Sequence, residues 1–71
     1  MNKEEVKTIL KGLKKEGKEL HITLSTKRFY NGTVLSIDEE DNCLRFNDMR
    51  FGYSIIPFSL INGIELYREK E

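Results

Sequence analysis

The chain has 71 residues, and its 12 lysines and arginines balance its 12 aspartates and glutamates. A single domain of this length buries only about 60% of the surface that its unfolded chain exposes. One cysteine and one histidine exclude an internal disulfide and a His/Cys metal cluster, and the zero net charge excludes a protein that holds nucleic acid by bulk charge. We therefore expect self-association to stabilise the domain.

Other classes of protein are excluded by the absence of their motifs. No run approaches 18 apolar residues and the first residues are charged, so we expect no membrane span, no signal peptide and a cytoplasmic location. No Ser/His/Asp set and no phosphate-binding glycine loop appears. We therefore expect a protein that is not an enzyme and that needs neither a cofactor nor a metal.

The first predicted element is a helix over about residues 3–16. Asn2 can cap it, and Glu5 stands three residues later, as in a capping box. Gly17 is a favourable stop. The apolar residues recur at helical spacing and form one narrow stripe, made of Val6, Ile9, Leu10 and Leu13. A helix with so narrow a stripe must lie on something larger.

From about residue 19 the chain is rich in β formers, and in the first strand the apolar period is two, which predicts short strands. The expected strands cover residues 20–24, 28–37, 43–46 and 53–57, with a fifth around residues 64–67. Turns are expected over residues 25–27, 38–42 and 47–52, which contain several polar residues or glycine, and a further short turn is expected over residues 58–61, between the last two strands. Cys43 is expected to be a small core residue.

One position in this pattern allows two readings. Asn31-Gly32 between β formers is a strong hairpin signal and would divide residues 28–37 into two strands. Alternatively, Gly32 is the kink of one long, strongly bent strand, as a small barrel requires. We favour the kink because the turn at residues 25–27 already reverses the chain.

One helix followed by about five short antiparallel strands predicts a mainly β fold, a small barrel of SH3-like, OB-like or Sm-like type. Residues 1–71 form a single domain in this interpretation. The helix covers about residues 3–16 and the barrel covers about residues 19–67.

Residues 10–46, LKGLKKEGKELHITLSTKRFYNGTVLSIDEEDNCLRF, resemble the Sm-like superfamily and, within it, most closely the Hfq family of RNA chaperones. Gly32 follows the first strand by eight residues, Asp38 follows six later, and Asn42 four after that, as in the first Sm motif. The stretch SIIPFSLINGIEL is similar in shape to the last two strands of the family. The resemblance implies a five-stranded, strongly bent antiparallel barrel that closes a homo-oligomeric ring, a hexamer being favoured over a heptamer.

The resemblance also implies a pore-side surface for uridine-rich RNA, in the loops after the second and fourth strands. The matching residues are Asp38, Glu40, Asp41, Asn42, Ser54 and Ile56. Asn42 is the main candidate because its amide can pair with a base edge, although Asp and Asn also favour ordinary turns. The family's Lys-His or Arg-Gly pair is replaced here by residues 54–56, which carry no cation. We expect weaker pore-side binding or assistance from Arg50.

The opposite face binds adenine-rich RNA in the Hfq family. The positions that match it here are Thr23, Lys27, Arg28, Phe29, Tyr30 and Asn31. Cations interleaved with aromatic rings suit phosphate contact combined with base stacking. Strand alternation also places either Phe29 or Tyr30 in the core.

A third surface, the rim, is implied at the end of the helix. Lys14 and Lys15 match an arginine cluster of Hfq, with Lys11 nearby, although a solvated helix face is the slightly favoured interpretation. Together these expectations describe a ring subunit that binds single-stranded RNA and acts as an RNA chaperone in post-transcriptional regulation. The alternative is a small barrel subunit of a larger complex that does not bind RNA directly.

Overall fold

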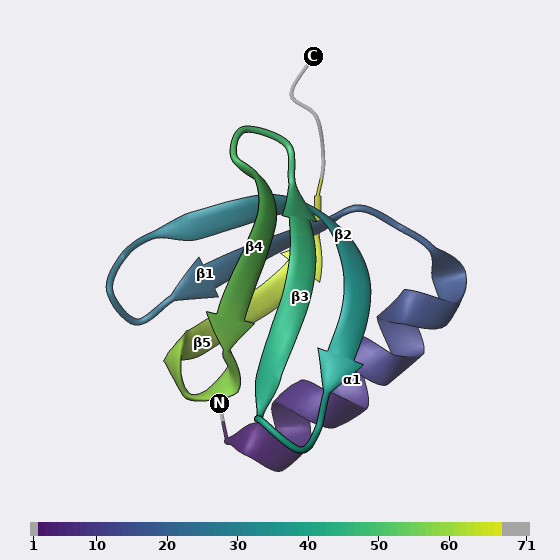
Figure 1. Ribbon diagram of the computed structural model, residues 1–71, viewed down its shortest axis with the longest axis vertical. Coiled ribbons are helices and arrows are strands. Elements are labelled where there is room, and N and C mark those ends of the chain that lie inside the picture. Colours follow the sequence, from purple (N-terminus) through teal and green to yellow (C-terminus); the bar gives the residue numbers. More distant parts are fainter. Residues whose placement is uncertain (1, 68–71) are drawn as a thin grey trace.

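The computed structural model describes residues 2–67, so the ends of the predicted domain, residues 1 and 68–71, lie outside the described residues. An N-terminal helix is followed by five strands (Figure 1). In chain order the elements are α1 (Lys3–Glu16), β1 (Leu20–Leu24), β2 (Phe29–Asp38), β3 (Cys43–Asp48), β4 (Gly52–Pro57), a 3₁₀ turn η1 (Phe58–Leu60) and β5 (Ile61–Leu66). The prediction of a mainly β chain with one N-terminal helix is confirmed.

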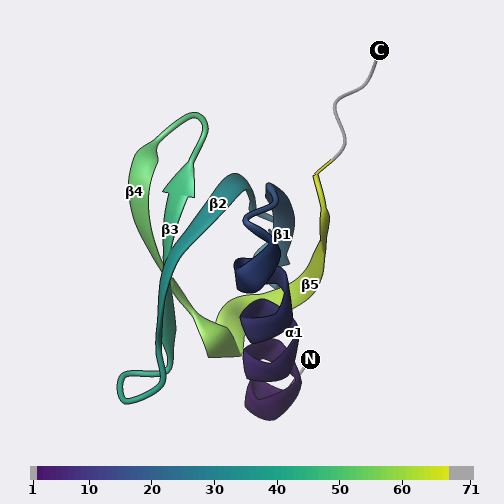
Figure 2. The same ribbon diagram turned by 90° about the vertical axis from the view of Figure 1, so that its right-hand side faces the viewer.

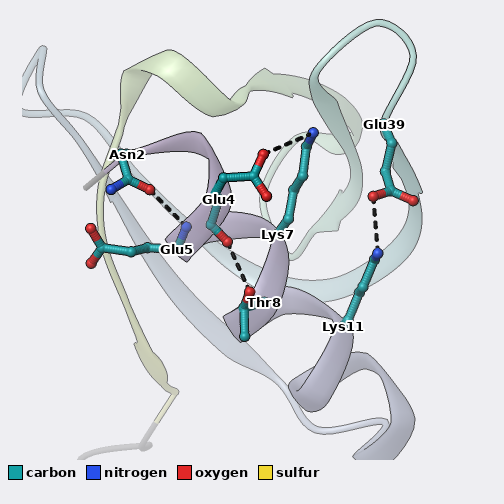
Figure 3. A network of polar contacts seen from close by, with 7 residues as sticks. All are labelled: Asn2, Glu4, Glu5, Lys7, Thr8, Lys11 and Glu39. Atoms are coloured by element: carbon teal, nitrogen blue, oxygen red, sulfur yellow. Dashed lines mark hydrogen bonds and ion pairs between the residues drawn. The ribbon is translucent and has the colours of Figure 1, made fainter.

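The helix begins and ends where local signals predict. The side-chain oxygen of Asn2 accepts the backbone N–H of Glu5 at 2.9 Å (Figure 3), which satisfies one of the free donors of the first turn. Gly17 adopts a φ of 63° and donates its N–H to the carbonyl of Lys14, a left-handed cap that suits glycine. Val6 and Leu10 of the predicted stripe are buried against the sheet.

The strands form one antiparallel sheet in the order β4-β3-β2-β1-β5. Figure 2 shows β2, β3 and β4 on one side of the molecule, and α1, β1 and β5 on the other. The sheet is not closed into a barrel, because no pairing joins β4 to β5 anywhere in residues 2–67. β5 instead pairs with β1, so each end of the sheet keeps an unpaired edge.

Strand β2 is continuous, so the hairpin reading of Asn31-Gly32 is wrong and the kink reading is confirmed. The strand pairs with β1 through residues 29–32 and with β3 through residues 32–38. Gly32 takes part in both pairings and packs against the backbone of Asn47. A bulge between Val34 and Ser36 bends the second half of the strand further.

The core lies inside the bent sheet and under α1. Alternate residues of β1 point into it, as the period of two predicts. The fully buried side chains are Val6, Leu10, Leu20, Ile22, Leu44, Phe46, Ile56, Phe58 and Ile61, and Cys43 is buried beside them. Across residues 2–67, no helix combines the length and the apolar character that crossing a membrane requires.

Candidate nucleic-acid interface

A hollow of about 380 Å³ lies between the β1–β2 turn and the β3–β4 loop. Both segments lie away from α1 (Figure 1). Cationic and aromatic side chains line it, and we call it the basic–aromatic hollow: Lys27, Arg28, Phe29, Tyr30, Arg50 and Phe51. Four of these six residues were predicted for the opposite face, and the structure brings them together with two residues from the β3–β4 loop.

The β1–β2 turn supplies two of the cations. Leu24 donates its N–H to the carbonyl of Arg28 at 2.8 Å, and Lys27 donates its N–H to the carbonyl of Leu24 at 3.0 Å. Lys27 adopts a φ of 69° to close this tight turn. Both cationic side chains belong to exposed residues, so their charges are available to a ligand.

Arg50 lies between two aromatic rings. Its guanidinium carbon is 4.7 Å from the centroid of Phe29 and 5.0 Å from the centroid of Phe51, within the range of cation–π attraction. One of its N–H groups also donates to the carbonyl of Phe29 at 3.5 Å. These contacts connect the β3–β4 loop to the start of β2 and join the two halves of the hollow.

Asp48 fixes the shape of the β3–β4 loop. One carboxylate oxygen accepts the N–H of Asn31 at 3.0 Å, and the other accepts the N–H groups of Arg50 and Phe51 at 2.9 and 2.8 Å. Burial of Asp48 opposes its ionisation, but the N–H donors of Phe51, Asn31 and Arg50 outweigh this effect and hold the pKa of the carboxyl below its ordinary value. An ionised carboxylate at this position therefore holds the Arg50–Phe51 segment in place.

The remaining opposite-face residues border the hollow. Thr23 is paired with Phe29, and Asn31 is paired with His21, so these side chains share the outer face of β1 and β2. His21 Nδ1 lies within hydrogen-bond distance of the side-chain oxygen of Asn31, and its ring lies 5.5 Å from that of Phe29. Tyr30 points the other way and packs against the core while lining the hollow.

The predicted pore-side turn is built by Asp38 and Asn42. Asp38 accepts the N–H of Asp41 at 3.0 Å and a guanidinium N–H of Arg45 at 3.2 Å. The N–H of Asp41, followed by the charge of Arg45, lowers the pKa of the Asp38 carboxyl despite partial burial. Asn42 has a φ of 53° and its carbonyl accepts the N–H of Phe58 at 3.0 Å, so its backbone conformation suits a turn, while Glu40 and Asp41 are exposed.

The residues matched to the partner loop of this turn lie inside a strand. Ser54 and Ile56 lie inside β4, and the segment that follows the fourth strand is η1. Ile56 is only 1% exposed and belongs to the core, so its side chain offers no contact surface. Ser54 donates its hydroxyl to the carbonyl of Gly52 at 3.2 Å. The hydrogen bond from Phe58 to Asn42 shows that η1 is the element beside the turn.

The rim lysines lie on α1, which lies away from the β1–β2 turn and the β3–β4 loop (Figure 1). Lys11 forms an ion pair of 2.9 Å with Glu39 (Figure 3), and this contact lowers the pKa of the Glu39 carboxyl. Lys14 and Lys15 are exposed in the last helical turn and take part in no ion pair within the described part of the chain. Their positive charges also lie near the negative end of the helix dipole, which stabilises the helix.

Sequence reasoning missed Phe51 and assigned Arg50 only an auxiliary role at the pore side. In turns, an aspartate side chain often accepts hydrogen bonds from backbone N–H groups a few residues later. Asp48 could therefore have identified the Arg50–Phe51 segment as an ordered turn. The sequence could not show that this segment folds against Phe29. Within residues 2–67, no group of three or more His, Cys, Asp or Glu side chains could hold a metal.

Three carboxyl groups make the free energy of unfolding depend on pH in the acid range. The pKa values of Asp38, Glu39 and Asp48 lie below their ordinary values of 3.8, 4.5 and 3.8, so the unfolded chain binds more protons than the folded one in this range. Their contribution is present above these ordinary pKa values and is lost as the pH falls through the lower folded pKa values. We expect urea denaturation to give a constant free energy of unfolding from pH 7 to about pH 5 and a falling one below about pH 4. A rise on acidification would contradict these assignments.

The geometry of the basic–aromatic hollow is the basis on which a function can be proposed. No family model, curated protein or solved structure matches the chain. The basic–aromatic hollow offers three cations and three aromatic rings at one place. This combination can bind phosphate groups and stack flat rings.

Proposed function

We propose that this protein binds single-stranded RNA through the basic–aromatic hollow, as one subunit of an Sm-like, Hfq-like ring. The observation that carries the proposal is the gathering of Lys27, Arg28 and Arg50 around exposed aromatic rings. In this role the protein acts as an RNA chaperone in post-transcriptional regulation.

The aromatic rings favour a single strand over a duplex. Stacking on a side chain requires a base whose face is free, and in a duplex both faces are covered by neighbouring bases. Phe29 and Phe51 are exposed, and Arg50 adds a planar cation between them. Positive charge alone would bind both forms of nucleic acid.

Ring formation is supported by the two free edges of the sheet. The outer edges of β4 and β5 both lack a partner strand within residues 2–67, and unpaired edges are a liability in natural proteins. Head-to-tail pairing of β4 with β5 of the next copy would cover every edge and close a ring. Six or seven copies would then repeat one modest site, so that weak contacts add up along a single RNA.

The assembly has a direct test. Native mass spectrometry of the purified protein is expected to give a homo-oligomer, with six subunits favoured over seven. Its mass should not change between moderate dilutions, because a closed ring buries all its edges. A stable monomer under these conditions would contradict the ring.

Charge reversal tests whether the hollow is the binding site. The double variant Lys27→Glu and Arg28→Glu is expected to weaken binding of fluorescein-labelled oligo(A) at least about tenfold, because two phosphate contacts become repulsions repeated around the ring. Fluorescence anisotropy measures the affinity. If the hollow corresponds to the adenine-binding face, oligo(U) should lose less affinity than oligo(A).

The matched control carries the same change of charge on the helix. Lys14→Glu and Lys15→Glu alter the net charge equally, but the two positions lie on α1, outside the hollow. We expect this variant to keep most of its affinity for oligo(A). Equal losses in the two double variants would indicate binding by general charge and would contradict the proposed site.

A second candidate function is favoured by exposed apolar side chains on β2 and β4. Leu35, Tyr53 and Ile55 are each about half exposed or more, and such side chains suit contact with another protein. In this alternative the chain is a subunit of a larger complex and does not bind RNA. Absence of binding to oligo(A) and oligo(U) at low salt would favour it.

A further inference from the structure

We propose that Arg50 and Phe51 form a subsite for one nucleotide, in which the guanidinium of Arg50 binds a phosphate and the ring of Phe51 stacks on the attached base. The inference rests on the proposed RNA-binding function and deepens it. It assigns a role to the β3–β4 loop, whereas Lys27 and Arg28 supply general affinity from the β1–β2 turn.

The first argument is the state of the Arg50 guanidinium. The ring centroids of Phe29 and Phe51 lie 4.7 and 5.0 Å from its central carbon. Within residues 2–67 the guanidinium donates only one hydrogen bond, to the carbonyl of Phe29. No carboxylate forms a salt bridge with it in the same residues. A guanidinium has five N–H donors in a fixed plane, which matches the geometry of a phosphate.

The second argument is the exposure of Phe51. The residue is 70% exposed although its ring is large and apolar. Arg50 approaches the ring at 5.0 Å, so most of the remaining ring surface is free. A nucleobase is a flat partner of suitable size for such a ring.

The third argument is that the loop is already arranged for binding. Asp48 accepts the N–H groups of both Arg50 and Phe51, so little ordering of the backbone is needed when a ligand binds. The hollow of about 380 Å³ lies at the small end of the range of about 300–1,000 Å³ for ligand sites. It therefore suits a single nucleotide, with the strand continuing toward Lys27 and Arg28.

Two conservative variants test the subsite by oligo(A) anisotropy. Arg50→Lys keeps the charge but loses the planar donors and the stacking, and we expect at least about fivefold weaker binding with an unchanged salt dependence. Phe51→Leu keeps an apolar side chain but loses the ring, and we expect a loss of at least about fivefold. Thermal melting monitored by circular dichroism should show that both variants fold like the wild type, since Arg50 and Phe51 are exposed.

Matched controls retain the feature that each variant removes. Phe51→Tyr preserves the ring and should bind like the wild type, and Arg45→Lys makes the same arginine-to-lysine change at a residue that does not line the hollow and should have little effect. If Arg50→Lys and Phe51→Leu bind as tightly as the wild type while reversal at Lys27 and Arg28 still weakens binding, the subsite is wrong and the proposed function stands. Absence of binding by the wild-type protein would overturn both.

Discussion

Replacing Gly32 with alanine is expected to lower the free energy of unfolding by about 3 kcal/mol or more, or to prevent folding altogether. A Cβ at this position would overlap the backbone carbonyl of Asn47 on the neighbouring strand. Backbone cannot move aside as a flexible side chain can, because Gly32 is paired with both β1 and β3. Urea denaturation followed by circular dichroism measures the change.

The same substitution elsewhere provides the control. Gly12 lies within α1, and a Cβ there would meet nothing within 4 Å. Gly12→Ala is therefore expected to stabilise the protein by about 0.5–1 kcal/mol, the usual difference in helix propensity. If Gly32→Ala were as well tolerated as Gly12→Ala, the close packing of β2 on β3 at the kink would be wrong.

Replacing Asp48 with alanine is expected to cost about 2–4 kcal/mol, because it removes a buried acceptor and leaves backbone donors without partners. The side chain is 3% exposed and accepts the N–H groups of Asn31, Arg50 and Phe51. Binding of oligo(A) is expected to weaken as well, because the loop that carries Arg50 and Phe51 is no longer held. Urea denaturation and anisotropy measure the two effects separately.

A carboxylate in another turn serves as the comparison. Asp41 is exposed, and its side chain accepts no hydrogen bond within residues 2–67, so Asp41→Ala should change stability by less than about 0.5 kcal/mol. Asp48→Asn keeps the shape and one acceptor oxygen and should fall between the two. Equal stability of the Asp48→Ala and Asp41→Ala variants would contradict the role of Asp48 in ordering the loop.

The helix and the strands could be predicted because their signals are local. Asn2 and Gly17 mark the ends of α1 through contacts within one turn, and alternation along Leu20–Leu24 follows from burial of one face. The kink at Gly32 could also be predicted, because the preceding turn left no room for a second reversal. Closure of the sheet into a barrel could not be predicted in this way, because it depends on whether the two edge strands pair with each other. Within residues 2–67, β4 and β5 do not pair.

The site was predicted in part for the same reason. Lys27, Arg28, Phe29 and Tyr30 are consecutive in the sequence and enter the hollow together. The contribution of Arg50 and Phe51 depends on Asp48, whose carboxylate accepts their N–H groups and also that of Asn31, 17 residues away from it in the chain. No local pattern reveals the contact with Asn31.

The placement of Ser54 and Ile56 has a related origin. They were matched to a loop motif by their position in the chain and not by their residue types, whereas the pairing of Leu44 with Ile56 places them inside β4, which ends at Pro57. Ile56 is buried because alternate residues of that strand face the core. Register across the sheet therefore decided the role of these residues.

Binding of wild-type protein to labelled oligo(A) and oligo(U), measured by anisotropy over a series of salt concentrations, tests the central proposal most directly. We expect binding at low salt that weakens as salt rises, with a log–log slope of about −0.7 for each phosphate neutralised, and a duplex of the same length should bind more weakly. Absence of binding to both oligonucleotides at low salt would contradict the proposal that this protein binds RNA.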